Sequence, residues 1–470
     1  MVKCSESLQL VNQKKFMDRM TVEKKYLSFS NFKHLNFWDY YTLSNKSQIH
    51  SNFKLIELSE VLTQRKVSIV IDDAIEYKRC RVQTRAQGVV LRDKVLGKEL
   101  KTKKQQLCKK DDFLVAEIDA KVGGYAIVPD CLENAIVSSH YFLFEIDNTK
   151  LLPEFLSILV KCSDFSKQIK ATGSTNYAAI RPYHVLRYLI PLPSISEQKE
   201  IVEIYNARIK FANEQEIKVD QLEKSIEEYL LYELGIKLRE QKNRLFGLQT
   251  ISFKEVNRWS LSHFFKDQLY SMSDIKFPVT SINSLITFFE GGKTPSTSRK
   301  DFWGGDVFWT SAKDMKELFL ENVKDKITYK AVTEARMKVY PKETIICVFR
   351  SGILRHSFPI SMTKIETTIN QDLKAIGVDE NMISKEYFLY YLKTFQKLIL
   401  HRSQKTGVTV ESINSEEFLD IPVVLPPLSK QKEISDVISS MLLEISEYKE
   451  QVRINRVLAI NGFENVIFKS

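Results

Sequence analysis

The chain has 470 residues, 43% of them apolar and 27% charged, a composition typical of a globular protein of about three domains. Its 15 glycines and 12 prolines are too few for a fibrous or largely disordered chain. No apolar stretch approaches the roughly 18 residues that span a bilayer, and the first residues lack a signal peptide's apolar core, so we expect a soluble, cytoplasmic protein. Lysines and arginines (69) exceed aspartates and glutamates (59) by 10, which suits either a polyanionic partner such as DNA or solubility alone.

The first half of the chain divides into an N-terminal segment, a β-rich domain and a long helix. Residues 1–50 show no clear pattern. Residues 51–195 contain short β-rich runs broken by turn residues, followed by a helical stretch that begins at Pro153. A proline-containing segment then enters a long helix, which we expect over residues 196–245.

The second half follows the same plan. A linker over residues 246–275 leads to a second β-rich domain over residues 276–428, which also contains a helical stretch, beginning at Ser384. A second long helix is expected over residues 429–470. The sequence therefore predicts a mixed α/β fold with two globular domains, two long helices and an internal pseudo-repeat.

An internal repeat supports this division. Pro191–Ile201 reappears as Val424–Ile434 with seven of eleven residues identical at a constant offset of 233. The Thr-Gly pair at Thr172 recurs at Thr406, displaced by one residue. A serine, Ser196 or Ser429, stands in each copy where we expect the cap of the long helix.

Both long helices carry an apolar stripe with alternating spacings of four and three residues. This 3.5-residue period favours a coiled coil, although each helix could instead pack on its own domain. Leu230, Leu234 and Leu238 lie outside the stripe, and we expect them to remain exposed for a partner protein. The stripe residues, called the seam below, are Ile201, Tyr205, Val219, Leu222, Ile226, Ile434, Ile438, Met441, Ile445 and Val452.

Motifs for catalysis or metal binding are missing from the sequence. The six cysteines form no Cys-x-x-Cys pair, and the seven histidines are not spaced as metal ligands, so we expect neither a disulfide framework nor a metal site. Asp111, Asp112 and Asp119-Ala-Lys121 resemble a nuclease carboxylate cluster, but the second copy has no carboxylate at the corresponding place. We therefore expect a chain without catalytic residues.

The repeated motifs resemble those of the DNA-specificity subunit of type I restriction–modification systems. In that family a Pro-Leu-Pro-Pro-Leu-x-Glu-Gln-x-x-Ile segment enters a long helix after each target-recognition domain, as Leu192–Ile201 and Leu425–Ile434 do here. Gly291-Gly-Lys-Thr-Pro-Ser296 and the Trp-Gly-Gly-Asp-Val-Phe-Trp stretch ending at Trp309 are similar to a further family signature. The first domain lacks both of these last motifs.

The resemblance implies a non-catalytic subunit that recognises an asymmetric bipartite DNA sequence. It implies two target-recognition domains separated by the two long helices, which form an antiparallel coiled coil. The implied partners are double-stranded DNA, two methyltransferase subunits and a helicase–nuclease restriction subunit, with no membrane. The chain itself would need no cofactor, whereas S-adenosylmethionine, ATP and Mg would serve the partner subunits.

Clusters of basic and small polar residues are the candidate DNA contacts, because cations bind phosphates and exposed donors read base edges. One cluster follows a glycine in the first domain, and two lie in the second. Solvated surface charge is the alternative for each residue singly. The candidates are Lys98, Lys101, Lys103 and Lys104; Lys293, Ser296, Thr297, Ser298, Arg299 and Lys300; and Arg350, Arg355 and His356.

Two other functions remain open from the sequence. A coiled-coil scaffold that binds only protein would show no salt-sensitive affinity for DNA. A specificity subunit of a related type II system, in which one partner chain both cleaves and methylates, would share the same motifs. The sequence does not separate these relatives.

Overall fold

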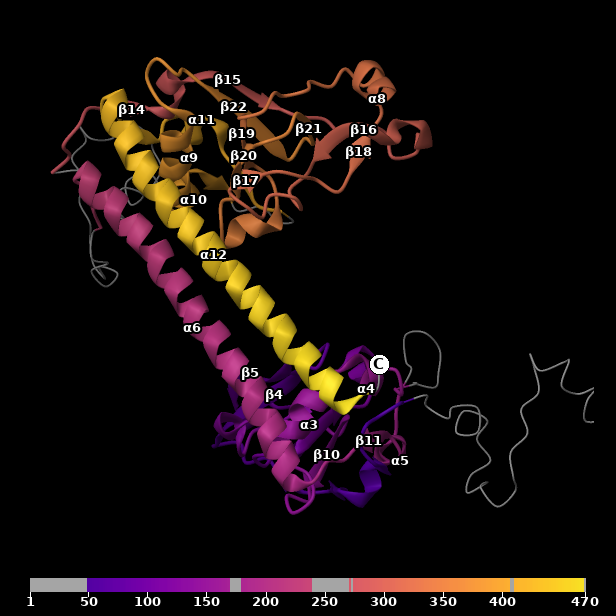
Figure 1. Ribbon diagram of the computed structural model, residues 1–470. Helices are drawn as coiled ribbons and strands as arrows, with labels where there is room; N and C mark the ends of the chain where they lie inside the picture. The colour runs from indigo at the N-terminus through magenta and orange to yellow at the C-terminus, as the bar shows by residue number, and fades with distance from the viewer. Residues whose placement is uncertain (1–48, 170–178, 239–269, 272–273, 406–409, 469–470) are drawn as a thin grey trace, which may run out of the picture. The chain divides into compact units, whose positions relative to one another are not determined.

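The computed structural model describes residues 49–169, 179–238, 270–271, 274–405 and 410–468, which form two compact units (Figure 1). Unit 1 comprises the chain up to Phe211 together with the residues from Ile454 onwards, and unit 2 comprises residues 212–453. Most of the expected N-terminal segment and of the linker over residues 246–275 lies outside the described residues. Within the described ranges, no helix is long and apolar enough to cross a membrane.

A four-stranded antiparallel sheet forms the centre of unit 1, in the order β2 (Leu62–Arg65), β10 (Tyr141–Ile146), β7 (Phe113–Ala116) and β8 (Tyr125–Ile127). β7 reads Phe-Leu-Val-Ala and is buried on both faces, as its uniformly apolar sequence predicts. Phe113 and Val115 pack into the core that includes α3 (Pro153–Leu159) and α4 (Ser163–Ser166), whereas Leu114 faces a smaller core on the other side.

A second sheet lies beside that smaller core. Its strand order is β3 (Ser68–Val70), β6 (Lys104–Leu107), β9 (Ile136–Val137), β4 (Glu76–Gln83) and β5 (Gly88–Leu96). Cys80 and Val89 of the β4–β5 hairpin pack against Leu114 and Leu143 of the central sheet. Burial of these side chains joins the two sheets of unit 1.

Unit 2 has the same central sheet with one strand more, in the order β15 (Ile286–Gly291), β22 (Leu373–Val378), β19 (Ile345–Val348), β20 (Ile360–Thr363) and β17 (Phe319–Leu320). The first four strands correspond to β2, β10, β7 and β8 of unit 1. The helices α9 (Lys385–Thr394) and α10 (Gln396–Ser403) contribute to the core of this sheet. The second sheet differs, because it contains only β18 (Lys326–Ile327), β16 (Trp303–Thr310) and β21 (Thr367–Ile369).

Both units close in the same way before the long helix. In unit 1, β1 (Leu55–Glu57) pairs with β11 (Leu189–Pro191), which follows α5 (Pro182–Leu186). In unit 2, β14 (Val279–Ser281) pairs with β25 (Pro422–Val424), which follows α11 (Ser415–Leu419). The prediction of a duplicated mixed α/β fold is thus confirmed, including for the first domain, which lacks the second domain's motifs.

Each long helix has 40 residues, α6 spanning Ile195–Leu234 and α12 spanning Leu428–Ile467. α6 ends at Leu234, eleven residues before the expected position 245. The next residue, Gly235, has a φ of 73°, a backbone conformation that favours glycine. The expected cap at Ser196 is wrong, because the helix begins one residue earlier. Ser194 accepts a hydrogen bond from the Glu197 N–H, and the Glu197 carboxylate accepts from the Ser194 N–H, which forms a capping box. Ser429 likewise lies inside α12 and is not its cap.

A buried glutamine in the repeated segment fastens α6 to unit 1. Gln198 Oε1 accepts the N–H of Leu152, the cap of α3, at 2.8 Å. Its Nε2 donates to the carbonyls of Lys150 and Pro193 at 2.8 and 2.9 Å. Three hydrogen bonds therefore satisfy a fully buried amide, which explains why glutamine occupies this position of the repeat.

Gln431 repeats this network in unit 2, 233 residues later. Its Oε1 accepts the N–H of Ser384, the cap of α9, at 2.8 Å. Its Nε2 donates to the carbonyls of Met382 and Pro426 at 2.9 and 2.8 Å. Each long helix is thus fixed by the same device to the domain that precedes it.

Within unit 2, α6 and α12 lie side by side and run in opposite directions (Figure 1). The Lys449 Nζ lies 2.9 Å from a carboxylate oxygen of Glu223. A second ion pair joins a carboxylate oxygen of Glu233 to the Lys430 Nζ at 2.9 Å. Glu233 comes ten residues after Glu223 in α6, whereas Lys430 comes nineteen residues before Lys449 in α12, so the two helices run in opposite directions. The predicted antiparallel pairing of the helices is confirmed here.

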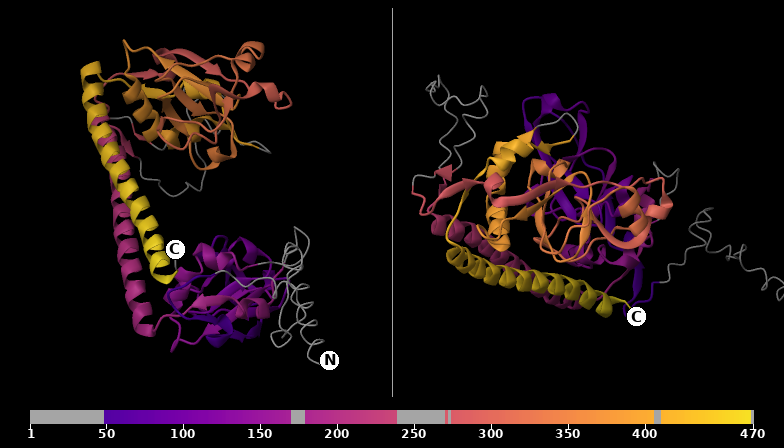
Figure 2. Two further views of the ribbon diagram at one scale, coloured as in Figure 1. Left: turned by 45° about the vertical axis from the view of Figure 1, so that its right-hand side comes forward. Right: turned by 90° about the horizontal axis from the view of Figure 1, so that it is seen from above.

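The helices also pair within unit 1 (Figure 2). The ring of Tyr205 on α6 meets the ring of Phe463 on α12 at a centroid distance of 6.4 Å. Phe463 also meets Phe155 of α3 at 5.4 Å, and Ile201 and Ile467 lie in the same core. The start of α6 and the end of α12 therefore contact each other and also pack on the core of unit 1.

Of the ten seam residues, six are buried (Ile201, Val219, Ile434, Ile438, Ile445 and Val452) and four are half-buried (Tyr205, Leu222, Ile226 and Met441). The expectation that Leu230 and Leu234 stay exposed is wrong. Both are fully buried in the core of unit 2, because the end of α6 packs on the central sheet. The side chain of Leu238 lies outside the described residues.

Candidate nucleic-acid interface

The segment from Lys293 to Lys300, called the 293–300 loop, joins β15 to η9 (Lys300–Phe302) in unit 2. Gly292 must be glycine, because a Cβ there would lie 1.9 Å from the carbonyl oxygen of Ile369. This close approach lets the Lys293 N–H donate to the same oxygen at 2.9 Å. The double glycine of the motif thus attaches the start of the loop to the end of β21.

Two tryptophans of the Trp-Gly-Gly-Asp-Val-Phe-Trp stretch hold the loop from β16. The indole N–H of Trp309 donates to the Lys293 carbonyl at 3.1 Å, and that of Trp303 donates to the Ser296 carbonyl at 3.2 Å. The two indoles contact each other edge to face at 5.1 Å. Since Pro295 is buried, the loop is a fixed structure that presents Thr297 and its neighbours on the surface.

Arg299 lies between two carboxylates. Its guanidinium forms hydrogen bonds of 2.8 and 2.6 Å with Asp301 and one of 3.1 Å with Glu334 of α8 (Tyr329–Glu334), and it covers the ring of Phe302 at 4.1 Å. Hydrogen bonding to Arg299 lowers the pKa of the Asp301 carboxyl below its usual range. The charge of Arg299 is thus balanced within the chain, whereas Lys300 makes no ion pair with any described residue.

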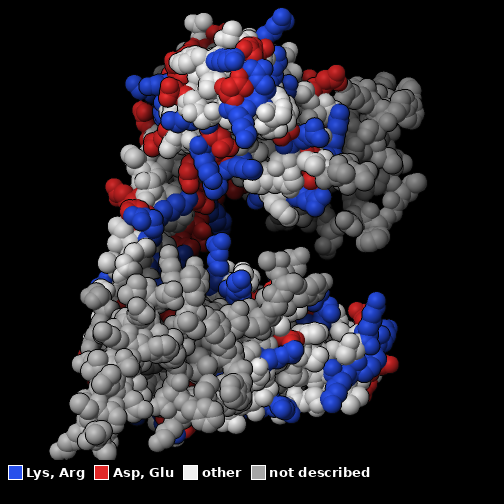
Figure 3. All heavy atoms as spheres, turned by 90° about the vertical axis from the view of Figure 1, so that its right-hand side faces the viewer, with Lys and Arg blue, Asp and Glu red and all other residues white. Residues whose placement is uncertain are grey.

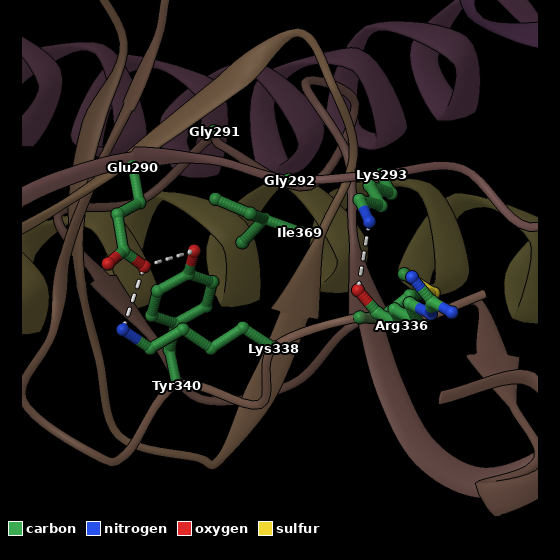
Figure 4. A pocket seen from close by; sticks show the side chains of 9 residues that line it. Glu290, Gly291, Gly292, Lys293, Arg336, Lys338, Tyr340 and Ile369 are labelled. Carbon is green, nitrogen blue, oxygen red and sulfur yellow. Dashed lines mark hydrogen bonds and ion pairs between the residues drawn. The ribbon is translucent and has the colours of Figure 1, made fainter. Parts of the chain in front are cut away.

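A pocket of about 370 Å³ opens beside the start of the loop (Figure 4). Lys293 Nζ donates to the backbone carbonyl of Arg336 at 3.0 Å. Across the pocket, Glu290 holds Lys338 at 2.7 Å and the hydroxyl of Tyr340 at 3.3 Å. The pocket therefore adds two exposed cations, Arg336 and Lys338, to the basic residues predicted from the sequence.

The other predicted cluster of unit 2 lies at the end of β19, around η10 (Gly352–Arg355). Arg350, Arg355 and His356 are all exposed, and Arg355 pairs with the buried carboxylate of Glu411. The N–H of Arg350 donates to the carbonyl of Asp372 at 3.2 Å.

The segment from Ile369, the last residue of β21, to Asp372, which directly precedes β22, brings the two clusters of unit 2 together. Its first residue accepts from Lys293, as described above. The side-chain carbonyl of Gln371 accepts a hydrogen bond from the hydroxyl of Thr294. The backbone carbonyl of Asp372 accepts one from the N–H of Arg350. Sequence spacing alone did not show that these clusters share one edge of the unit.

In unit 1, the predicted lysines lie along η3 (Gly97–Glu99) and the start of β6, so the expected loop is partly regular structure. All four side chains are exposed. Lys103 pairs with Asp73 and also donates to the Gly97 carbonyl at 2.8 Å. Lys98, Lys101 and Lys104 make no side-chain ion pair with the described residues.

The face drawn in Figure 3 shows a group of Lys and Arg side chains at one edge of unit 1, with few acidic neighbours, whereas both signs of charge mix on unit 2.

In the described part of the chain, no group of three or more His, Cys, Asp or Glu side chains could hold a metal ion. Asp112, one of the carboxylates considered for a nuclease, is buried and pairs with Arg65. Burial raises the pKa of the Asp112 carboxyl, and this effect outweighs the opposite effect of its hydrogen bond with Arg65.

No motif in the sequence marks Arg336 and Lys338, which stand between α8 and Tyr340. The only sequence feature that could have indicated them is the pair of basic residues on either side of the apolar Met337. In unit 1, the carboxylate of Glu117 meets Arg181 and His140, which are 41 residues apart in the sequence and belong to no motif.

Comparison with known proteins places both halves of the chain in one family. The family model described as "Type I restriction modification DNA specificity domain" matches residues 50–224 and 274–456. The specificity subunit of the Escherichia coli type I restriction enzyme EcoR124I/EcoR124II is 30% identical over 177 residues, 37% of this chain and 43% of that protein, so the match spans less than half of that relative. The HindI specificity subunit of Haemophilus influenzae is 22% identical over 410 residues, 77% of this chain and 87% of that protein.

A solved structure described as showing the assembly and conformational transition of the type I R-M system is 16% identical, with a TM-score of 0.49 over 89% of this chain and 99% of that one. The family model, which covers well over half of the chain, is decisive. The resemblance seen in the sequence is thereby confirmed, and the chain belongs to the family of type I restriction–modification DNA specificity domains.

Proposed function

We propose that this chain recognises an asymmetric DNA sequence of two short half-sites, separated by a fixed number of unread base pairs, and brings modification and restriction subunits to it. The observation that carries the proposal is the duplication of the domain with divergence of its outer parts. The central sheets share their strand order, but the second sheets have five strands in unit 1 and three in unit 2. Two readers that differ in this way are expected to read different half-sites.

The long helices supply a means of setting the spacer. Both α6 and α12 run from one unit into the other, and 40 residues at 1.5 Å each give a helix of about 60 Å. Two readers must meet the same side of the duplex, so a centre-to-centre distance near one helical turn, about 10 base pairs, is natural.

Two methyltransferase subunits and a helicase–nuclease restriction subunit are the proposed protein partners. Apolar side chains remain exposed on the helices after they pair, including Leu443 at 67%, Ile204 at 57% and Ile217 at 56%. These residues replace Leu230 and Leu234 as candidates for binding a methyltransferase. Catalysis, with its S-adenosylmethionine, ATP and Mg, belongs to the partners, and Leu443→Glu should weaken co-purification of the methyltransferase.

Binding of the assembled complex to random and cognate duplexes over a range of salt concentrations tests the function. The proposal predicts a sequence preference together with a salt-dependent affinity for all DNA. A protein-binding scaffold predicts neither. The related type II assembly is distinguished by its partner, because there a single copurifying chain would both methylate and cleave.

A further inference from the structure

A carboxylate at the end of β7 in unit 1 holds two basic side chains. One oxygen of Glu117 lies 2.9 Å from Nδ1 of His140, and the other accepts a hydrogen bond from Nη1 of Arg181 at 2.7 Å. The Glu117 side chain is only 14% exposed, whereas those of Arg181 and His140 are 59% and 69% exposed. An anchored acid therefore fixes two basic groups at the surface.

The same place in unit 2 carries the cluster at the end of β19. In unit 1 the N–H of Glu117 donates to the His140 carbonyl at 2.8 Å, and its own carbonyl accepts from Ile180 at 3.0 Å. In unit 2 the N–H of Phe349 donates to the Asp372 carbonyl at 2.8 Å, and its carbonyl accepts from Ile413 at 2.8 Å.

The two sets of backbone bonds join residues that correspond in the repeat. Glu117 corresponds to Phe349 and His140 to Asp372, both at an offset of 232 residues. Ile180 corresponds to Ile413 at an offset of 233. Phe349 directly precedes Arg350, so the Glu117 cluster occupies in unit 1 the position of a candidate DNA contact in unit 2. The side chains at this position differ completely between the units, as expected for readers of different sequences.

The chemistry of the Glu117 cluster suits base edges better than phosphates. The Glu117 carboxylate offsets the charge of Arg181 and would repel a phosphate. Arg181 uses one guanidinium nitrogen for Glu117 and its backbone N–H for Nδ1 of His184, and its remaining guanidinium N–H groups have no hydrogen-bond partner among the described residues. An arginine held in this way can donate to O6 and N7 of guanine, the most frequent specific contact in the major groove.

We infer that Arg181 and His140, positioned by Glu117, contact base edges in the half-site that unit 1 reads. This inference rests on the proposed function and adds specificity-determining residues to it. Arg181 and His140 are the contacting groups, and Glu117 is a positioning residue.

The test uses the assembled complex of the full chain with its methyltransferase subunits. Its affinity is measured for the cognate duplex and for duplexes with single base changes in either half-site. Arg181→Ala should lower discrimination at one or two base pairs of a single half-site by roughly 5- to 150-fold. The slope of log affinity against log salt should change by less than the value of about 0.9 expected for one phosphate contact.

Two further variants and a control separate reading from folding. Arg181→Lys keeps the charge and the pairing with Glu117 but loses the bidentate geometry, so it should also lose discrimination. Glu117→Gln should weaken discrimination at the same base pairs. Lys150→Ala is the control, because Lys150 is an exposed cation paired with Asp147, which follows the end of β10 opposite to His140. It should leave both the discrimination between base pairs and the salt slope unchanged.

The remaining outcomes contradict the inference in different ways. Unchanged discrimination in Arg181→Ala, with a normal preference at the half-site of unit 2, refutes the inference and leaves the proposed function intact. An equal loss of affinity for every sequence, with a slope reduced by about 0.9, makes Arg181 a phosphate contact. A wild-type complex without any sequence preference refutes the proposed function and the inference with it.

Discussion

Replacing both Lys101 and Lys104 with alanine should weaken binding to all DNA sequences alike. Both side chains are exposed and make no ion pair with the described residues, so each can neutralise a phosphate without breaking an internal contact. Lys103 differs, because it already pairs with Asp73 and donates to a backbone carbonyl. The structure therefore separates lysines that the sequence presents as one cluster.

The size of the effect follows from the release of counterions. Each phosphate contact contributes about 0.9 to the slope of log affinity against log salt, so loss of two contacts lowers the slope by about 1.8. Between 50 and 200 mM salt, where log salt changes by about 0.6, the ratio of wild-type to variant affinity should fall about twelvefold. Fluorescence anisotropy with a labelled duplex, repeated at four or five salt concentrations, measures this change.

Lys103→Ala is the control for a single lysine of the double variant, because it removes one positive charge two residues from Lys101. We expect it to change the slope by less than half as much as the double variant, because Asp73 already offsets its charge. Equal slopes for the wild type and the double variant would show that this surface does not meet DNA. A larger effect for Lys103→Ala than for the double variant would refute the reasoning from ion pairing.

Other substitutions probe the fold and the spacer. Gln431→Ala removes three hydrogen bonds from a buried site and should lower the free energy of unfolding by about 2–4 kcal/mol in chemical denaturation. Gly292→Ala should disorder the start of the 293–300 loop and weaken recognition of one half-site in duplex competition, whereas Gly462→Ala in α12, where an added Cβ would meet nothing within 4 Å, should not. Deleting seven residues from each of α6 and α12 shortens the helices by about 10 Å and should shorten the spacer by about three base pairs or abolish methylation, as sequencing of the methylated sites would show.

Much of the fold followed from the sequence because periodicity and repetition report directly on burial. The seam positions and the offset of 233 indicated both long helices and their equivalence. The start of α6 was misplaced because Ser194 and Ser196 are both good caps, and only the bond of Ser194 with Glu197 distinguishes them. Burial of Leu230 was missed because it depends on a sheet built from residues more than 50 positions away.

The candidate site was less predictable, since its residues meet only through the sheets. The motif indicated Lys293, but its place beside Arg350 depends on the segment between β21 and β22. Arg299 looked like a free cation and is instead balanced by Asp301 and Glu334. Ion pairing of this kind leaves no periodic signal in a sequence.

Sequencing of the methylated bases in a host that carries the complete system tests the central claim most directly. Two different readers joined by paired helices predict one asymmetric motif, made of two unlike half-sites with a spacer of constant length. Transfer of Arg181→Ala into this host should relax only one of the half-sites. A single continuous motif, or a palindromic one, would contradict the account.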